Sequence, residues 1–167
     1  FAIIILENKG KEKNFMAIRE IVQHTDPFIR KKSRDVKFID DNIIELLDDM
    51  KETVLAANGS GLAAVQVGVL KRIFVINING AYLEFINPQI IKQSGEQHQV
   101  EGCLSVKMPY GYVKRPMHVT VKALDRSGNE FTFSGTDYTA IALCHEYDHL
   151  EGIIYTDKCE RFLKDGE

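Results

Sequence analysis

The spacing of the hydrophobic residues predicts two main helices. The first follows the capping pair Asp40-Asp41, repeats its apolar residues every three or four positions, and ends near Asn58-Gly59. The second begins at Thr136 or Asp137 and runs to about Leu150. The apolar stripe of the first helix, which we interpret as core packing, consists of Ile43, Leu47, Met50 and Val54.

Between these helices, four stretches have the pattern of β-strands. Residues 72–78 form a nearly continuous apolar run, and residues 81–86 follow as a second strand, which Asn87-Pro88 ends. Residues 118–124 alternate apolar and polar side chains, and residues 130–134 return as the hairpin partner. Because the strands cluster between the helices, the predicted fold class is α+β, with largely antiparallel β-sheets packed around the second helix.

The chain of 167 residues is long enough for one hydrophobic core, and residues 16–167 are predicted to form a single catalytic domain. Residues 1–15 differ, because an apolar patch over residues 2–6 is followed by a polar stretch without periodicity. This pattern favours a leader or an appended segment, and whether the natural protein contains it stays open. The alternative is a genuine strand over residues 2–6. Residues 157–163 are expected to form a short C-terminal helix.

Charge and cysteine content narrow the class of protein. The net charge of −3 gives no general electrostatic attraction to nucleic acid, so no specific nucleic-acid partner is expected. Three cysteines do not form a secreted disulfide framework and fit a reducing compartment. The apolar run near the start is far shorter than the roughly 20 residues that span a bilayer, so no membrane partner is expected either.

The strongest chemical signal is His145-Glu146-Tyr147-Asp148-His149, an HExxH motif on the second predicted helix. Two histidines four residues apart lie within about 40° on one helix face, so both rings can reach one metal ion. Glu146 then lies close enough to handle a proton of an attacking water. The alternative is a pair of surface histidines that form salt bridges with their acidic neighbours.

A metal site on this motif needs a third ligand. Residues 150–167 contain no histidine, and their acidic residues lie in a polar tail. Upstream, Cys103 follows Gly102 in the segment Glu101-Gly102-Cys103-Leu104-Ser105, and a thiolate would complete a Cys-His-His set with the fourth position open. Taken alone, a residue such as Cys103 is more often a small buried apolar side chain than a ligand.

Three separated segments together resemble the peptide deformylase family, and the likeness extends from about residue 17 to a little beyond residue 152. They are Gly59-Ser60-Gly61-Leu62-Ala63-Ala64-Val65-Gln66, Glu101-Gly102-Cys103-Leu104-Ser105 and His145-Glu146-Tyr147-Asp148-His149-Leu150. The resemblance implies hydrolysis of the N-formyl group from the N-terminal methionine of newly made polypeptides, with release of formate. It further implies formylmethionyl peptides as partners, proximity to the ribosome, and a place in the bacterial cytoplasm rather than in an organelle.

The same resemblance assigns roles to individual residues. Cys103, His145 and His149 would bind one divalent metal ion, natively Fe²⁺, with Zn²⁺, Ni²⁺ or Co²⁺ as substitutes. Glu146 would take a proton from water and pass it to the leaving amine, and the backbone N–H of Leu104 and the side-chain amide of Gln66 would hold the oxyanion. The substrate-binding residues would be Gly59, Gly61, Leu62, Gly102 and Ile141.

Two positions depart from the family pattern. Cys144 stands where the family usually has Gln, and Lys107 stands where Pro is common. At about 100° per residue, Cys144 lies about 140° from His149 around the helix, so we predict that it packs in the core and is not a ligand. Arg115 and Asp148 also match family positions, either as a buried pair or as exposed charges.

Two other functions remain open at this stage. A zinc endopeptidase would need its third ligand after His149, in the short tail. A structural metal module without activity would need a fourth protein ligand, for which Cys144 or Cys159 could be considered.

Overall fold

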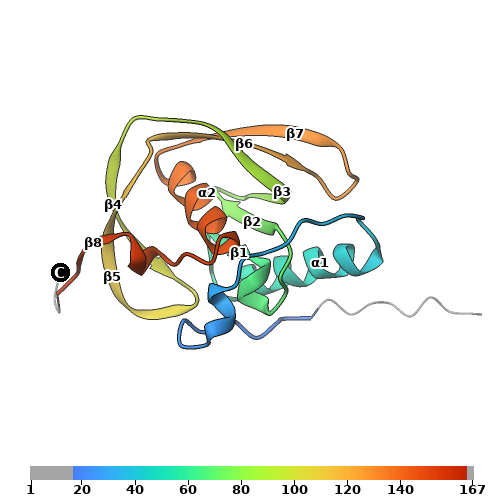
Figure 1. The fold of residues 1–167 in the computed structure, drawn as a ribbon, viewed down its shortest axis with the longest axis horizontal. Coiled ribbons are helices and arrows are strands. Elements are labelled where there is room, and N and C mark those ends of the chain that lie inside the picture. The colour runs from blue at the N-terminus through green and yellow to red at the C-terminus, as the bar shows by residue number, and fades with distance from the viewer. Residues whose placement is uncertain (1–16, 165–167) are drawn as a thin grey trace, which may run out of the picture.

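The structure is a computed structural model that describes residues 17–164. Both predictions for residues 1–15 therefore concern positions outside the described residues. Within these residues, two helices and eight strands follow one another (Figure 1). The helices are α1 (Asp41–Ala56) and α2 (Asp137–Leu150), and short 3₁₀ turns lie at Pro27–Arg30, Ala64–Val67 and Tyr155–Asp157.

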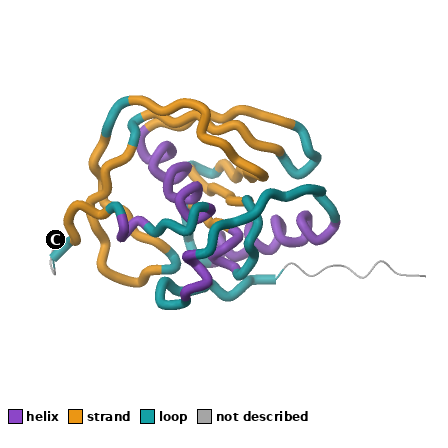
Figure 2. The backbone as a smooth tube through the Cα atoms, viewed as in Figure 1, coloured by secondary structure: helices purple, strands orange, loops and turns teal. Residues whose placement is uncertain are grey.

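The strands form two antiparallel sheets. The first has the order β1-β2-β3-β6-β7 and the second has the order β4-β5-β8. The helix α2 lies inside the molecule with strands of both sheets around it, while α1 covers the other side of β1 and β2 (Figures 1 and 2). The strands are β1 (Gly61–Ala63), β2 (Ile73–Ile78), β3 (Ala81–Ser94), β4 (Gln97–Cys103), β5 (Val106–Arg115), β6 (His118–Leu124), β7 (Glu130–Thr136) and β8 (Cys159–Phe162).

Both predicted helices are confirmed, and local chemistry explains where they begin and end. The carboxylate of Asp40 accepts a hydrogen bond from the backbone N–H of Ile43 at 3.1 Å, which caps α1. Beyond α2, Gly152 has φ of +76°, a left-handed conformation that ends the helix at little cost for glycine.

The antiparallel α+β class is confirmed, but the strand predictions needed two corrections. Asn87-Pro88 does not end β3, which runs on to Ser94 paired with β6 after a register shift between Ile86 and Gln89. The C-terminal helix expected over residues 157–163 is wrong, because this segment forms β8 and pairs with β5. Pairing with a distant strand overrides local propensity there.

The core between the first sheet and α2 is largely aromatic on the sheet side. Phe85 is fully buried and stacks on Phe74, with 4.7 Å between ring centroids, and Phe131 and Phe133 pack around it at 5.4 and 5.9 Å. The same cluster includes Leu143 from α2. These rings therefore fix the depth at which α2 lies in the fold.

Replacing Phe85 by Ala should lower the free energy of unfolding by about 3–5 kcal/mol, because it leaves a cavity beneath α2. Urea unfolding followed by circular dichroism measures the change. The control is Ile91→Ala on the same strand, where the side chain is 53% exposed and little should change. Equal effects of the two substitutions would contradict this account of the core.

Candidate metal centre

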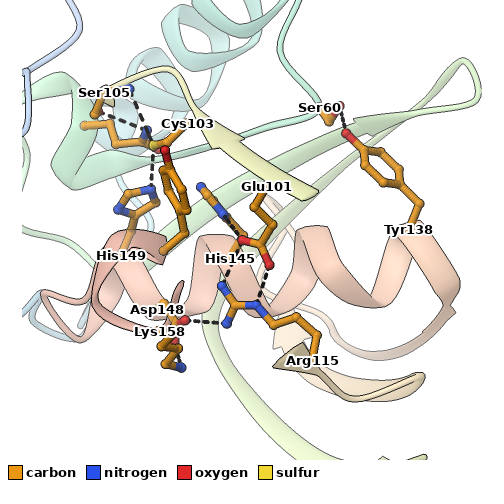
Figure 3. A network of polar contacts seen from close by, with 12 residues as sticks. Ser60, Glu101, Cys103, Ser105, Arg115, Tyr138, His145, Asp148, His149 and Lys158 are labelled. Carbon is orange, nitrogen blue, oxygen red and sulfur yellow. Dashed lines mark hydrogen bonds and ion pairs between the residues drawn. The ribbon is translucent and has the colours of Figure 1, made fainter. Parts of the chain in front are cut away.

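Three ligand-type side chains converge between the second sheet and α2. Cys103 comes from the end of β4, and His145 and His149 come from one face of α2 (Figure 3). One ligand atom from each lies within 4.8 Å of the others, and Cys103 Sγ lies 3.3 Å from His149 Nε2. Ligands of a tetrahedral cation are spaced by about 3.3–3.6 Å, given bond lengths near 2.0–2.3 Å. The donor set therefore fits a divalent transition metal.

The orientation of His145 is fixed by Glu101. The imidazole Nδ1 lies 2.8 Å from Glu101 Oε2, so it donates to the carboxylate and leaves Nε2 as the free ligand atom. Glu101 is buried on β4, two residues before Cys103. Burial alone would raise the pKa of Glu101, but hydrogen bonds from His145 and Arg115 lower it to about 2. The carboxylate is therefore ionised whenever the protein is folded at neutral pH.

Arg115 connects Glu101 to α2. Its guanidinium donates to the two Glu101 oxygens at 2.6 and 3.0 Å and to Asp148 Oδ2 at 2.5 Å, and only 3% of the side chain is exposed (Figure 3). Asp148 also forms an ion pair with Lys158, whose Nζ donates to Asp148 Oδ1 at 2.7 Å. Arg115 and Asp148 therefore form a buried ion pair and are not exposed charges. Removing one partner of such a buried pair costs about 3–5 kcal/mol.

His149 is buried, and its surroundings disfavour the protonated imidazole. Burial, reinforced by the neighbouring His145 and Arg115, lowers the pKa of His149 well below its usual value. A neutral imidazole is the form that ligates metals. Its Nδ1 has no hydrogen-bond partner among the described residues.

Glu146 projects into the same space with its carboxylate only partly satisfied. The residue is 4% exposed, and Oε2 has no hydrogen-bond partner in residues 17–164. Burial raises the pKa of Glu146 to about 7, against the lowering effect of His145. A buried carboxylate oxygen without a partner requires an explanation, and a proton-transfer role beside the metal ligands supplies one.

The backbone of β1 passes directly over this carboxylate. A Cβ atom on Gly61 would lie only 2.7 Å from Cγ and 2.8 Å from Cδ of Glu146. Contacts below 3.0 Å force one group to move, and the Glu146 side chain is enclosed. Gly61 therefore gives Glu146 the room that its position requires.

Gln66, in the 3₁₀ turn after β1, presents its amide nitrogen to the metal centre. Its Oε1 accepts from the backbone N–H of Ala63 at 2.8 Å, which fixes the direction of the amide. Its Nε2 then points at Ser105 Oγ, 3.2 Å away, and at Cys103 Sγ, 3.6 Å away. A fixed N–H donor beside a metal ligand is suited to a developing negative charge.

A cleft of about 560 Å³ opens in front of these groups. Most of the predicted site residues line it, namely Gly59, Gly61, Gln66, Gly102, Cys103, Leu104, Ile141, His145 and Glu146. His149 lies behind the cleft, while Leu62 is fully buried and packs in the core on the α1 side. Gly102 leaves room for the ring of Tyr110, since a Cβ there would lie 2.5 Å from Tyr110 Cδ1.

Sequence reasoning gave no role to Glu101, Ser60 or Tyr138 in the cleft, although all three line it. Lys107, which the family pattern puts in or near the pocket wall, lines it as well. For Glu101, its place two residues before the ligand cysteine was a signal that could have indicated an orienting carboxylate.

The polypeptide deformylase family model matches residues 18–165. A peptide deformylase of Acetivibrio thermocellus is 53% identical over 152 residues, covering 91% of this chain and 89% of the relative. That of Caldicellulosiruptor bescii is 50% identical over 152 residues, covering 91% and 92%. The crystal structure of a Legionella pneumophila peptide deformylase superposes with a TM-score of 0.84 at 41% identity, covering 86% of this chain and 87% of that one.

The chain belongs to the peptide deformylase family. As a peptide deformylase it is a metal-dependent hydrolase that removes the N-formyl group from nascent polypeptides, as the sequence predicted. None of the helices in residues 17–164 has both the length and the apolar character needed to cross a membrane.

The thiol of Cys144, a departure from the peptide deformylase pattern, packs in the core cluster on the far side of α2. Burial raises the pKa of this thiol to about 11, so it is protonated and a poor ligand. Cys159 donates to the backbone carbonyl of Arg161 at 3.1 Å. Within the described residues, Cys103, His145 and His149 are the one group of three that could hold a metal, which leaves the closed structural site without a fourth ligand.

Replacing Gly61 by Ala should lower kcat at least tenfold while metal content stays stoichiometric, because the new methyl group displaces the Glu146 carboxylate and no metal ligand. Formate release measures kcat, and metal analysis measures the metal content. The control is Gly80→Ala in the β2–β3 turn, where φ is +77°, which should lower thermal stability but leave kcat unchanged. Wild-type turnover in Gly61→Ala protein would mean that this contact does not position Glu146.

Proposed function

We propose that Cys103, His145 and His149 hold the catalytic cation of this deformylase, and that Fe²⁺ fills the site natively, with Zn²⁺, Ni²⁺ or Co²⁺ as substitutes. The observation that carries the ligand assignment is the convergence of one sulfur and two ring nitrogens within 4.8 Å, with the histidines buried and the cysteine half-buried. The preference for Fe²⁺ rests on the family resemblance. A divalent cation bound there lowers the pKa of a ligated water and polarises a carbonyl group.

Glu146 is the general base and then the general acid of the reaction. Its carboxylate lines the cleft, lies next in sequence to a ligand histidine, and has an oxygen without a partner among the described residues. Because burial holds its pKa near neutrality, the group exchanges a proton readily in either direction. It removes a proton from the attacking water and delivers it to the amine that leaves.

Gln66 and Leu104 bind the oxygen of the formyl group. The Nε2 of Gln66 already points toward Cys103, and Leu104 follows Cys103 in the chain, so its backbone N–H is close to the same place. Negative charge on this oxygen grows as water adds to the carbonyl carbon. Fixed N–H donors therefore stabilise the transition state more than the bound substrate.

The peptide lies along the cleft with its first side chain against apolar atoms. Gly59, Gly61, Leu104 and Ile141 line this part of the cleft, and Gly102 brings the Tyr110 ring to its rim. The flexible thioether of methionine fits such a surface. β1 and β4 are edge strands of the two sheets, and an exposed edge can pair with an extended peptide irrespective of its sequence.

The substrate chemistry also suggests where the enzyme acts. Formylated nascent chains emerge at the ribosome, so we place the protein near ribosomes in a bacterial cytoplasm. The relatives with about 50% sequence identity are bacterial. All three cysteines are free thiols, which fits a reducing compartment.

The roles of ligand and base can be separated by two substitutions. Cys103→Ala should lose stoichiometric metal and all activity, since two histidines alone hold a cation weakly. Glu146→Ala should keep the metal and lose about 10²–10⁴-fold in kcat, because only proton transfer is removed. Metal analysis of anaerobically purified proteins, combined with formate release from formyl-Met-Ala-Ser, measures both. Full metal occupancy in Cys103→Ala protein, or wild-type turnover in Glu146→Ala protein, would require these roles to be reassigned.

A further inference from the structure

Two hydroxyl groups meet across the end of the cleft that is remote from His149. Ser60 Oγ, in the segment before β1, lies 2.7 Å from Tyr138 Oη, in the first turn of α2 (Figure 3). Both residues line the cleft; Ser60 is partly exposed and Tyr138 is 56% exposed. The next two cleft-lining residues along the helix, Ile141 and Ala142, are buried and apolar. A polar pair thus lies at one end of the cleft, next to the apolar surface of Ile141 and Ala142.

Helix geometry places this pair at the reach of the first side chain of the substrate. Tyr138, Ile141, Ala142, His145 and Glu146 all line the cleft, which is the spacing of one helix face. Tyr138 is seven residues from His145, or about 10 Å along the axis. The six bonds from a formyl carbon to the methyl group of methionine extend about 7 Å, so the end of the side chain comes within about 3 Å, along the helix axis, of the turn that carries Tyr138.

The backbone holds both hydroxyls in place. Asp137, just before Tyr138, has φ of +50°, an uncommon value for a residue other than glycine. Its carbonyl accepts from Gln97 Nε2 at 3.0 Å, and its N–H donates to the carbonyl of Met117 at 3.1 Å. The carbonyl of Ser60 accepts from the N–H of Asn77 at 2.8 Å. Such a fixed and unusual conformation next to a cleft residue is typical of a functional position.

The hydroxyl pair has one hydrogen-bond donor to spare. Each hydroxyl carries one proton, and one of the two protons is used between Ser60 and Tyr138. Neither hydroxyl has another hydrogen bond within residues 17–164. The remaining O–H is therefore free to donate to an acceptor that enters the cleft. The thioether of methionine is a weak acceptor, whereas the oxygen of its sulfoxide is a strong one.

We propose that the Ser60–Tyr138 pair is a specificity determinant that lets this enzyme also deformylate chains whose first residue is methionine sulfoxide. The inference rests on the proposed function, in which the first side chain lies in this cleft. The sulfoxide oxygen accepts the spare O–H at the end of the cleft, which offsets the loss of water around it. The sulfur of a sulfoxide is a stereocentre, so a fixed donor on one side favours one epimer.

The test compares kcat/KM for formyl-Met-Ala-Ser with that for the two separated epimers of formyl-Met(O)-Ala-Ser, in the metal-loaded enzyme. The wild type should hydrolyse one epimer faster than the other. Tyr138→Phe and Ser60→Ala should each lower the ratio of sulfoxide to methionine rates by about 2- to 12-fold, the factor that one neutral hydrogen bond contributes, because the hydroxyl that remains loses the partner that fixes its position. Both should also reduce the epimer preference, an effect that a general loss of structure does not produce.

The matched control is Ser134→Ala, which removes a similar surface hydroxyl pair at 2.9 Å to Thr120, outside the cleft. It should leave the ratio and the epimer preference as in the wild type. Calorimetric titration of the same peptides into metal-loaded Glu146→Ala protein gives a second readout, in which the two hydroxyl variants should weaken binding of the favoured epimer alone.

The outcomes separate two kinds of failure. If the wild type does not release formate from formyl-Met-Ala-Ser, the proposed function fails. If it does, but neither epimer is hydrolysed, or Ser60→Ala leaves the ratio unchanged, the inference about the hydroxyl pair is overturned. Ser60→Ala alone decides the matter should Tyr138→Phe protein not fold.

Discussion

The buried guanidinium of Arg115 is the interaction on which the metal centre depends. It stands at the end of β5, donates to Glu101 on β4, and donates to Asp148 on α2. One cation therefore ties together the two strands of the hairpin that supplies Cys103 and the helix that supplies both histidines. A buried guanidinium is tolerated only when its carboxylate partners are in place. This requirement restricts β4, β5 and α2 to one relative arrangement. Through Glu101, the same arrangement also sets the orientation of His145.

The helix α2 shows how packing and chemistry share one element. It lies between the sheets and is buried around most of its circumference, which usually demands apolar residues throughout. Its buried polar residues are those that the proposed reaction uses or supports: Glu146, Asp148 and His149. Cys144 occupies the apolar side of the same helix and contributes packing alone. The face of each residue, set by the helical repeat, decides its role.

The elements that sequence reasoning predicted are those with regular local patterns, such as α1, α2 and the β6–β7 hairpin. It missed β4 and β5, because inward positions there carry Gln97, Glu101 and Arg115, which break the apolar alternation. These buried polar residues support the candidate site. The apolar alternation therefore failed to predict strands in the region where the functional residues are concentrated. The proposed ligand set was accessible from motifs, whereas the Ser60–Tyr138 contact was not, because it joins two segments that only the fold brings together.

The central claim is an open site with one thiolate and two imidazoles. X-ray absorption at the metal edge of the anaerobically purified protein tests it most directly, since sulfur and nitrogen ligands give separate distances. The account predicts one sulfur and two imidazole nitrogens at each metal ion, with the remaining coordination supplied by light atoms from solvent. Two sulfur ligands, or none, would contradict it.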